Sequence, residues 1–392
     1  MKKNWFLFLS FIKKPENVFI SLSLFFGVLS AVLVPQLSVS DENMHYLRAY
    51  GISQGRVESG SRCTLPKDVA KRAGSVYEGN FSADYSKPID RNILDVDKCS
   101  SASGYPPIMH LPQAVGINIA NIFGGSTGLT ILFGRLANLI FYSFALYFII
   151  KWVRVGKWVF VVIGLIPLMV HMAASLSSDC VTNVAVFVIT ALTLNLFTQK
   201  NALSNKQIAA LVCTGILLTL TKSINALLLF PLIFLPKHLF AANKNKNIPF
   251  NIQKWAILIM IGVAAIISLL IWQKIFGQPL LTTGATHNPL HSNPLKFIQI
   301  LFNTYMNPTI GYTDIVLRGS VGDFSSFKYH LPLFVLIPLF SLLFLSLLHY
   351  NKKDQELLGE QTGKLAVYNL ATIGLFVCAV SYAMYTAWAL LP

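Results

Sequence analysis

Apolar runs long enough to cross a bilayer recur along almost the whole chain, with short polar segments between them. A transmembrane helix needs about 20 mostly apolar residues. On that rule the sequence predicts nine spans, at residues 17–37, 127–150, 158–175, 181–198, 207–221, 223–236, 255–273, 331–349 and 365–389. The fifth and sixth are short and meet at "LTLTKSINALL", which suits a tight hairpin. The pattern predicts an all-α integral membrane protein, with residues 1–392 forming a single polytopic helical bundle.

One large hydrophilic segment, residues 39–126, interrupts the apolar pattern as a first loop, and residues 274–330 are predicted to form a second loop. The first ends in "YPPIMHLPQAVGINIANIFGG", which is apolar but too short to span a bilayer comfortably. A helical wheel places its polar and apolar side chains on different sides. The polar side carries His110, Gln113, Asn118 and Asn121, and the apolar side carries Ile108, Leu111, Val115 and Ile122. This arrangement predicts an interfacial or re-entrant helix within the first loop.

Composition and charge support the membrane interpretation and predict an orientation. Only 12% of the residues are charged, whereas soluble domains carry about 25%. The net charge of +15 comes from lysines in short segments between apolar runs, so it does not indicate a nucleic-acid partner. Cytoplasmic loops of membrane proteins are enriched in Lys and Arg. Their distribution predicts a cytoplasmic N-terminus, with both hydrophilic loops on the outer side.

Two cysteines, Cys63 and Cys99, lie in the first hydrophilic segment. If that loop is outside the cytoplasm, it lies on the oxidising side of the membrane. A disulfide between them would close a long loop and stabilise the fold by roughly 3–5 kcal/mol. Two unpaired thiols are the alternative, and the sequence does not decide between the two.

The stretch "VPQLSVSDENMHYLRAY", residues 34–50, places charged residues directly after the first predicted span. If a helix continues there, Asp41, His45 and Arg48 share one face by their i, i+4, i+7 spacing, and Glu42 points elsewhere. A functional interpretation is a carboxylate base held by a nearby cation at the membrane surface. The alternative is an ordinary helix exit with solvated charges.

Four further polar residues lie at the same predicted height. Ser178 and Asp179 form a very short turn before the fourth span, where the alternative role is an N-cap. Lys222 separates the fifth and sixth spans, and Arg135 lies about two turns into the second. A charge at membrane depth costs roughly 2.5–3.5 kcal/mol and often marks a functional site, although Arg135 could also snorkel or pair with a structural acid. Acids and cations at one membrane edge suit a ligand that carries both a phosphate and a lipid tail.

An ordered set of motifs along the chain resembles a known family. The set comprises "PQLSVSDENMHYLRAYGISQG", "GYPPIMHLPQAVG", "GRLANLIFYSFAL", "IPLMVHMAASLSSD" and "GILLTLTKSINALLLFPLIFLP". It resembles predicted bacterial multi-pass membrane proteins that are grouped with the GT-C glycosyltransferases. The resemblance implies a GT-C-like bundle in the bacterial cytoplasmic membrane, with interfacial helices in the large outer loop. It also implies that Asp41 is the catalytic base and Glu42 lies beside it. Family members usually continue beyond a segment like "YAMYTAWALLP", so either a shortened relative or a truncated frame is expected here.

The sequence and this resemblance together predict an extracytoplasmic glycosyltransferase. The expected partners are membrane lipid, a polyprenyl-phosphate-linked sugar donor, and a glycan or lipid acceptor. Cofactors are left open, including a divalent metal such as Mg or Mn. Asp41, Glu42 and His45 are the expected catalytic residues, Lys222 and Arg135 the donor phosphate ligands, and the supporting residues are Arg48, Asp179, Ser178, Tyr105 and His110. The alternatives are a lipid-linked-sugar flippase or transporter and a non-catalytic envelope-assembly protein.

Overall fold

The computed structural model describes most of the chain. The described residues are 11, 13–56, 64–95, 101–240, 250–276, 299, 302–303, 306, 322–324, 329–348, 352–359 and 361–388. Cys63 and Cys99 lie outside these residues, as does most of the predicted second loop, 274–330. The disulfide therefore stays a prediction.

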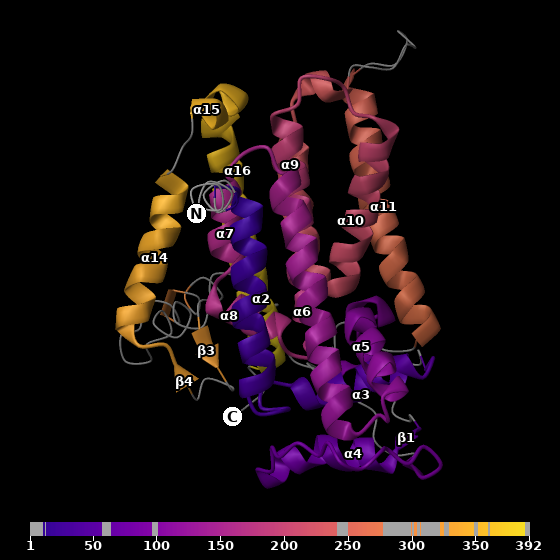
Figure 1. The fold of residues 1–392 in the computed structure, drawn as a ribbon. Helices are drawn as coiled ribbons and strands as arrows, with labels where there is room; N and C mark the ends of the chain where they lie inside the picture. The colour runs from indigo at the N-terminus through magenta and orange to yellow at the C-terminus, as the bar shows by residue number, and fades with distance from the viewer. Residues whose placement is uncertain are drawn as a thin grey trace.

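Long apolar helices run side by side along most of the molecule (Figure 1). Among the described residues, five helices are long and apolar enough to cross a membrane. They are α2 (Pro15–Leu33), α6 (Thr127–Trp152), α9 (Asp179–Phe197), α11 (Phe250–Phe276) and α16 (Gln361–Trp388). The shorter apolar helices are α10 (Asn205–Thr221), η4 (Ser223–Phe234) and α14 (Leu333–Leu348). The described residues confirm an all-α membrane protein, because the only strands among them are two antiparallel pairs of two residues each.

Two of the nine predicted spans differ from the observed helices. The span expected at 158–175 is broken into α7 (Lys157–Gly164) and α8 (Pro167–Ala173). Pro167 begins the second piece because proline lacks the N–H that a continuous helix would need. The expected sixth span is η4, a 3-10 helix of 12 residues with Pro231 inside it. At about 2.0 Å per residue, η4 extends further than an α-helix of the same length would.

The first hydrophilic segment gathers at one end of the bundle, at the bottom of Figure 1, which we call the loop end. It contains α3 (Glu42–Ser53), α4 (Lys67–Gly74) and α5 (Leu111–Ile122). Short 3-10 turns accompany them: η1 (Ser75–Glu78), η2 (Ser101–Gly104) and η3 (Pro107–His110). Strand β1 (Leu65–Pro66) pairs with β2 (Leu94–Asp95). A buried cluster that includes Leu37, Tyr46, Ile117 and Ile131 joins this region to α6.

The structure follows the predicted sides of α5 only in part, because Asn118 of the polar side is exposed and the apolar Ile117 is buried. His110 and Gln113 are fully buried, whereas Val115 is 55% and Ile122 is 79% exposed. Gly116 lies against the backbone carbonyl of Phe133 in α6, where a Cβ would overlap that carbonyl. The close α5–α6 contact, with apolar residues such as Val115 and Ile122 exposed on the other side, fits a helix that lies at a membrane interface.

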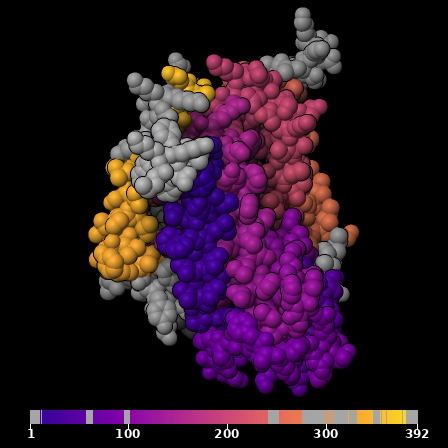
Figure 2. All heavy atoms as spheres, in the orientation of Figure 1, coloured from indigo at the N-terminus to yellow at the C-terminus, as the bar shows by residue number. Residues whose placement is uncertain are grey.

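The remaining elements are short. They are η5 (Lys237–Phe240), β3 (Asp323–Phe324), β4 (Tyr329–His330) and α15 (Lys352–Leu358), and β3 pairs with β4. Large apolar side chains cover the outer surfaces of the bundle. Phe25 of α2 is 60% exposed and Phe334 of α14 is 77% exposed. Figure 2 shows α2 at the surface between α14 and α6. Such a surface suits a lipid solvent rather than water.

Candidate functional site

Glu42 and Arg135 form a fully buried ion pair at the loop end. Arg135 donates from Nε to Glu42 Oε1 at 2.8 Å and from Nη2 to Oε2 at 2.7 Å, and both side chains are 0% exposed. The other Arg135 donors reach backbone carbonyls at the exit of α2, those of Ala31, Val34 and Pro35. A guanidinium has five N–H donors, and all five are used here. The structure therefore leaves Arg135 no donor for a phosphate and fits the alternative of pairing with a structural acid.

The same pair holds the turn between α8 and α9. Leu176 N donates to Glu42 Oε1 at 3.1 Å. Gln113 and Asn138 donate side-chain N–H groups to backbone carbonyls of Ser175, Leu176 and Ser177. These hydrogen bonds fix the conformation of the turn that precedes Asp179 at the loop end. The sequence reasoning did not select Gln113 or Asn138 as site residues, because a lone amide on an apolar helix gives no signal of its partner.

Asp41 occupies the position just before α3. Its φ of 57° lies in the left-handed region, which is uncommon for residues other than glycine. Its carbonyl accepts hydrogen bonds from Met44 N and His45 N, and its side chain is exposed. Helix α3 begins at Glu42, so Asp41 lies just outside the helix. The predicted helical face shared by Asp41, His45 and Arg48 would have needed Asp41 inside it. An exposed carboxylate beside a buried histidine is nevertheless accessible to a substrate.

His45 and His110 form a buried pair behind Asp41. Nδ1 of His45 lies 2.9 Å from Nε2 of His110. Burial lowers the pKa of both imidazoles below their ordinary value, so both are neutral at pH 7. Nδ1 of His110 has no hydrogen-bond partner in the described part of the chain. A buried unsatisfied N–H is costly, so the proton of His110 is expected on Nε2, donating to His45. The second proton-bearing nitrogen of the pair is then Nε2 of His45.

Asp179 and Lys222 form a second ion pair, and this pair is open. Lys222 Nζ donates to Asp179 Oδ1 at 2.7 Å, and the two side chains are 42% and 34% exposed. Burial lowers the pKa of Lys222, but the charge and hydrogen bond of the Asp179 carboxylate outweigh burial and raise it. Lys222 is therefore charged at neutral pH while part of its ammonium group still faces solvent.

Electrostatic interactions connect the open pair to the histidines. The charges of Asp179 and Asp41 oppose the lowering of the His45 pKa, and Lys222 adds to it. Tyr105 acts on Lys222, and its ring centroid lies 6.1 Å from that of His45. Segments far apart in the sequence thus meet at the loop end. We call this set the outer cluster: Asp41, His45, Tyr105, His110, Asp179 and Lys222.

The two remaining supporting residues have structural contacts. Arg48 is buried and donates from Nη2 to the carbonyl of Tyr105 at 3.1 Å. Ser178 is buried at the N-cap position of α9 without a side-chain capping bond. Instead, Ser177 Oγ accepts from Asp179 N at 3.1 Å. The sequence analysis gave N-capping as the alternative role of Ser178 or Asp179, and in the structure the side chain of Ser177 makes this bond instead.

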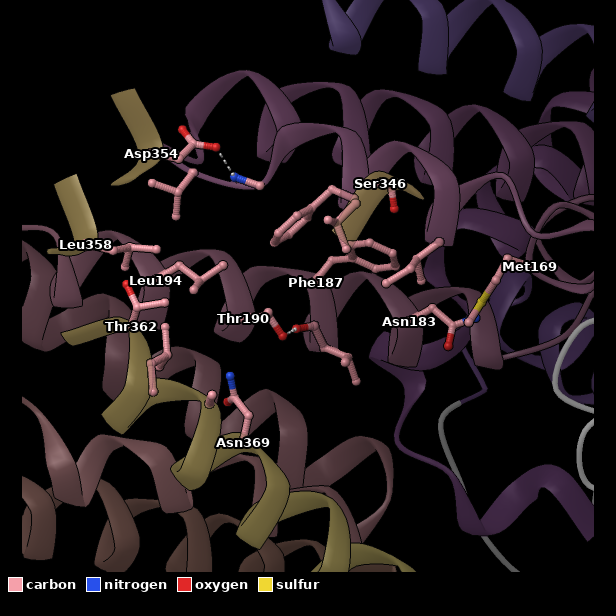
Figure 3. Close-up of a pocket in the computed structure, with 18 residues that line it drawn as sticks. Met169, Asn183, Phe187, Thr190, Leu194, Ser346, Asp354, Leu358, Thr362 and Asn369 are labelled. Carbon is pink, nitrogen blue, oxygen red and sulfur yellow. Dashed lines mark hydrogen bonds between the residues drawn. The ribbon is translucent and has the colours of Figure 1, made fainter. Parts of the chain in front are cut away.

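No group of three or more His, Cys, Asp or Glu side chains suited to a metal ion occurs among the described residues. Among the cavities of the bundle are two that no residue of the outer cluster lines. One, of about 960 Å³, lies between α2, α8 and α14. The other, of about 490 Å³, runs along α9 from Asp354 at one end to Met169 and Asn183 at the other (Figure 3). Asp354 accepts a hydrogen bond there from Gly156 N at 3.3 Å.

Comparison with known proteins decides the family. The chain matches the family described as "Predicted membrane protein (DUF2142)" over residues 24–390. The chain belongs to this family. No curated protein and no solved structure matches it. The match to DUF2142 covers the whole outer cluster, but the description names no activity, so membership establishes a membrane protein and the sugar-transfer chemistry is a proposal.

Proposed function

We propose that this DUF2142 protein is a membrane glycosyltransferase of the GT-C type that acts on the outer side of the bacterial cytoplasmic membrane. The observation that supports the proposal best is the open Asp179–Lys222 pair beside Asp41 and His45. A half-exposed lysine can exchange part of its solvation for a phosphate. A separate exposed carboxylate is free to accept a proton. The proposed transfer of a sugar from a lipid phosphate uses both groups at the membrane surface.

In the proposed reaction Lys222 holds the phosphate of a polyprenyl-phosphate-linked sugar. Asp41 accepts the proton of an acceptor hydroxyl as its oxygen attacks the anomeric carbon. The bond between that carbon and the phosphate oxygen breaks, and the polyprenyl phosphate leaves with its negative charge beside Lys222. One base and one displacement imply inversion at the anomeric carbon. His45 supports the acceptor with its Nε2 proton.

The roles first expected for Glu42 and Arg135 change in this proposal. Glu42 and Arg135 bond to each other, so Lys222 alone is proposed to bind the phosphate. The Glu42–Arg135 pair instead forms hydrogen bonds with the backbone at the end of α2 and with the turn before Asp179. Such positioning matters because small displacements of catalytic groups reduce rates strongly. A cytoplasmic N-terminus is part of the proposal, since it places the loop end outside.

Asp41→Asn tests the proposed base directly. Asparagine also tolerates the left-handed backbone at this position, so the fold should be kept while the basic oxygen is lost. We expect transfer from a panel of polyprenyl-phosphate sugars, assayed in membranes, to fall by roughly 100-fold or more. The matched control is Asp84→Asn, which makes the same change at an exposed loop-end residue outside the outer cluster.

The outcome also separates the alternatives. A flippase would move the lipid-linked sugar without forming a new glycosidic bond, and an assembly protein would do neither. Unchanged transfer by Asp41→Asn, or movement of the donor with no glycosylated product in the wild type, would end the proposal.

A further inference from the structure

The cavity between α2, α8 and α14 is large and lies close to the loop end. Its volume of about 960 Å³ is at the upper end of ligand pockets, which span about 300–1,000 Å³. Leu22, Phe26 and Ser30 line it from α2, His171 from α8 and Leu342 from α14. These helices belong to the apolar bundle, so the cavity is built at membrane depth.

The cavity wall is continuous with the lipid-facing surface. Phe26 and Leu342 line the cavity and are still 54% and 53% exposed. Their neighbours Phe25 and Leu345, which do not line it, are 60% and 59% exposed. A molecule dissolved in the bilayer can therefore reach the cavity sideways between α2 and α14, without passing through water.

The polar groups of the cavity are uncharged hydroxyl and imidazole groups. Ser30 Oγ lies 3.2 Å from Nδ1 of His171, and Ser38 lines the cavity nearer the loop end. None of the described lining residues is Asp, Glu, Lys or Arg. A phosphate would find no cation there, whereas a hydroxyl or ester group would find hydrogen-bonding partners. The cavity therefore suits a neutral lipid better than the donor, whose phosphate matches Lys222.

The cavity is also connected to the proposed base. Ser38 lies three residues before Asp41, so their Cα atoms are at most about 11 Å apart. The carbonyls of Val34 and Pro35, two further lining residues, accept hydrogen bonds from Arg135. The buried Glu42–Arg135 pair thus fixes one wall of the cavity relative to the outer cluster.

We infer that this cavity binds the acceptor, and that the acceptor is a neutral membrane lipid with a free hydroxyl group. The role of this lipid as the acceptor rests on the proposed function, whereas the binding of a neutral lipid in the cavity does not require sugar transfer. The apolar chains lie between α2 and α14. The hydroxyl-bearing end points toward Ser38 and Asp41.

Photolabelling of the purified full-length protein in proteoliposomes tests the binding. The probe is a diacylglycerol with a diazirine in one acyl chain, and labelled peptides are mapped by mass spectrometry. Leu22→Trp fills the cavity from α2, and Leu29→Trp is its matched control, because Leu29 is 41% exposed, close to the 38% of Leu22, but does not line the cavity. We expect roughly tenfold less labelling of the peptide that carries His171 in Leu22→Trp, and none of this loss in Leu29→Trp.

A second pair of variants, on α14, keeps the test decisive if Leu22→Trp does not fold. Leu342→Trp lines the cavity from α14, and Leu345→Trp lies on the same helix outside it. Excess unlabelled diacylglycerol should suppress labelling, and an equal amount of phosphatidylglycerol should not. Equal labelling of lining and control variants, or equal competition by the anionic lipid, would overturn the inference. Labelling is measured without a sugar donor, so it does not depend on transfer. A wild type that labels as expected but transfers no sugar would overturn the proposed function and not the lipid site.

Discussion

The loop end contains two acid–base pairs with the same closest distance and opposite surroundings. Glu42–Arg135 and Asp179–Lys222 each have a nitrogen–oxygen distance of 2.7 Å. The first pair is 0% exposed and its guanidinium is saturated by protein acceptors, whereas the second is 42% and 34% exposed. Distance alone therefore does not separate a structural pair from a candidate binding pair. Exposure and the number of unused donors do.

The largest expected effect comes from breaking the closed pair. Arg135→Met leaves Glu42 buried without its partner, and removing one member of a buried pair costs about 3–5 kcal/mol. We expect the free energy of unfolding in detergent to fall by that amount, or the protein to fail to accumulate in membranes. The comparison is made by denaturation of the purified protein against the wild type.

The double variant Glu42→Leu/Arg135→Met is the control for this effect. Replacing a whole buried pair by apolar residues is often close to neutral, so part of the lost stability should return. Arg135 also holds three backbone carbonyls at the exit of α2, so recovery should be incomplete. A loss below about 1 kcal/mol in Arg135→Met would contradict a structural role for the pair.

Acidification should have an intermediate effect, through the histidines next to the open pair. Burial lowers the pKa of His45 and His110 in the folded state, so the unfolded chain binds more protons below its ordinary histidine pKa. Stability is therefore fully present above about pH 6.5 and falls as the pH drops from there toward the lowered folded-state pKa values. Each neutral buried imidazole contributes up to about 1.4 kcal/mol per pH unit in that window.

The matched variant is His110→Gln, which keeps a side-chain N–H donor for His45 but does not titrate. Its unfolding free energy should depend less on pH between 6.5 and 5.5 than that of the wild type. The exposed His238 provides a control position with the same substitution. An identical pH dependence in wild type and His110→Gln would show that the histidine pair does not control acid stability.

Much of the bundle is predictable from the sequence, because apolar length is a local property. The spans expected at 127–150 and 181–198 correspond to α6 and α9 within a few residues. The rule of apolar length did not predict the helix break at Pro167, because a hydropathy window registers apolar side chains and not a missing backbone N–H. The 3-10 geometry of η4 was not predicted either. Helix η4 packs against α9, α10 and α16, and a hydropathy window does not register such tertiary contacts.

The sequence predicted which residues belong to the candidate site better than it predicted which of them pair with one another. The sequence selected Asp41, His45, Asp179 and Lys222, and electrostatic interactions in the structure connect all four. It assigned Arg135 to a phosphate because its acid partner, Glu42, lies 93 positions away in the chain. The His45–His110 contact spans 65 positions. Such pairs depend on tertiary packing, which spacing within one helix does not encode.

The smallest expected change in stability comes from the open pair. Exposed ion pairs contribute about 0–1 kcal/mol, because water solvates both partners when the pair is broken. Lys222→Met should therefore unfold within about 1 kcal/mol of the wild type, yet lose transfer from polyprenyl-phosphate sugars in membranes. Lys222→Arg keeps the positive charge and should retain part of that activity. If Lys222→Met instead lost as much stability as Arg135→Met, both pairs would be structural. The difference in exposure would then carry no functional meaning, and the loop end would need another cation to hold a phosphate.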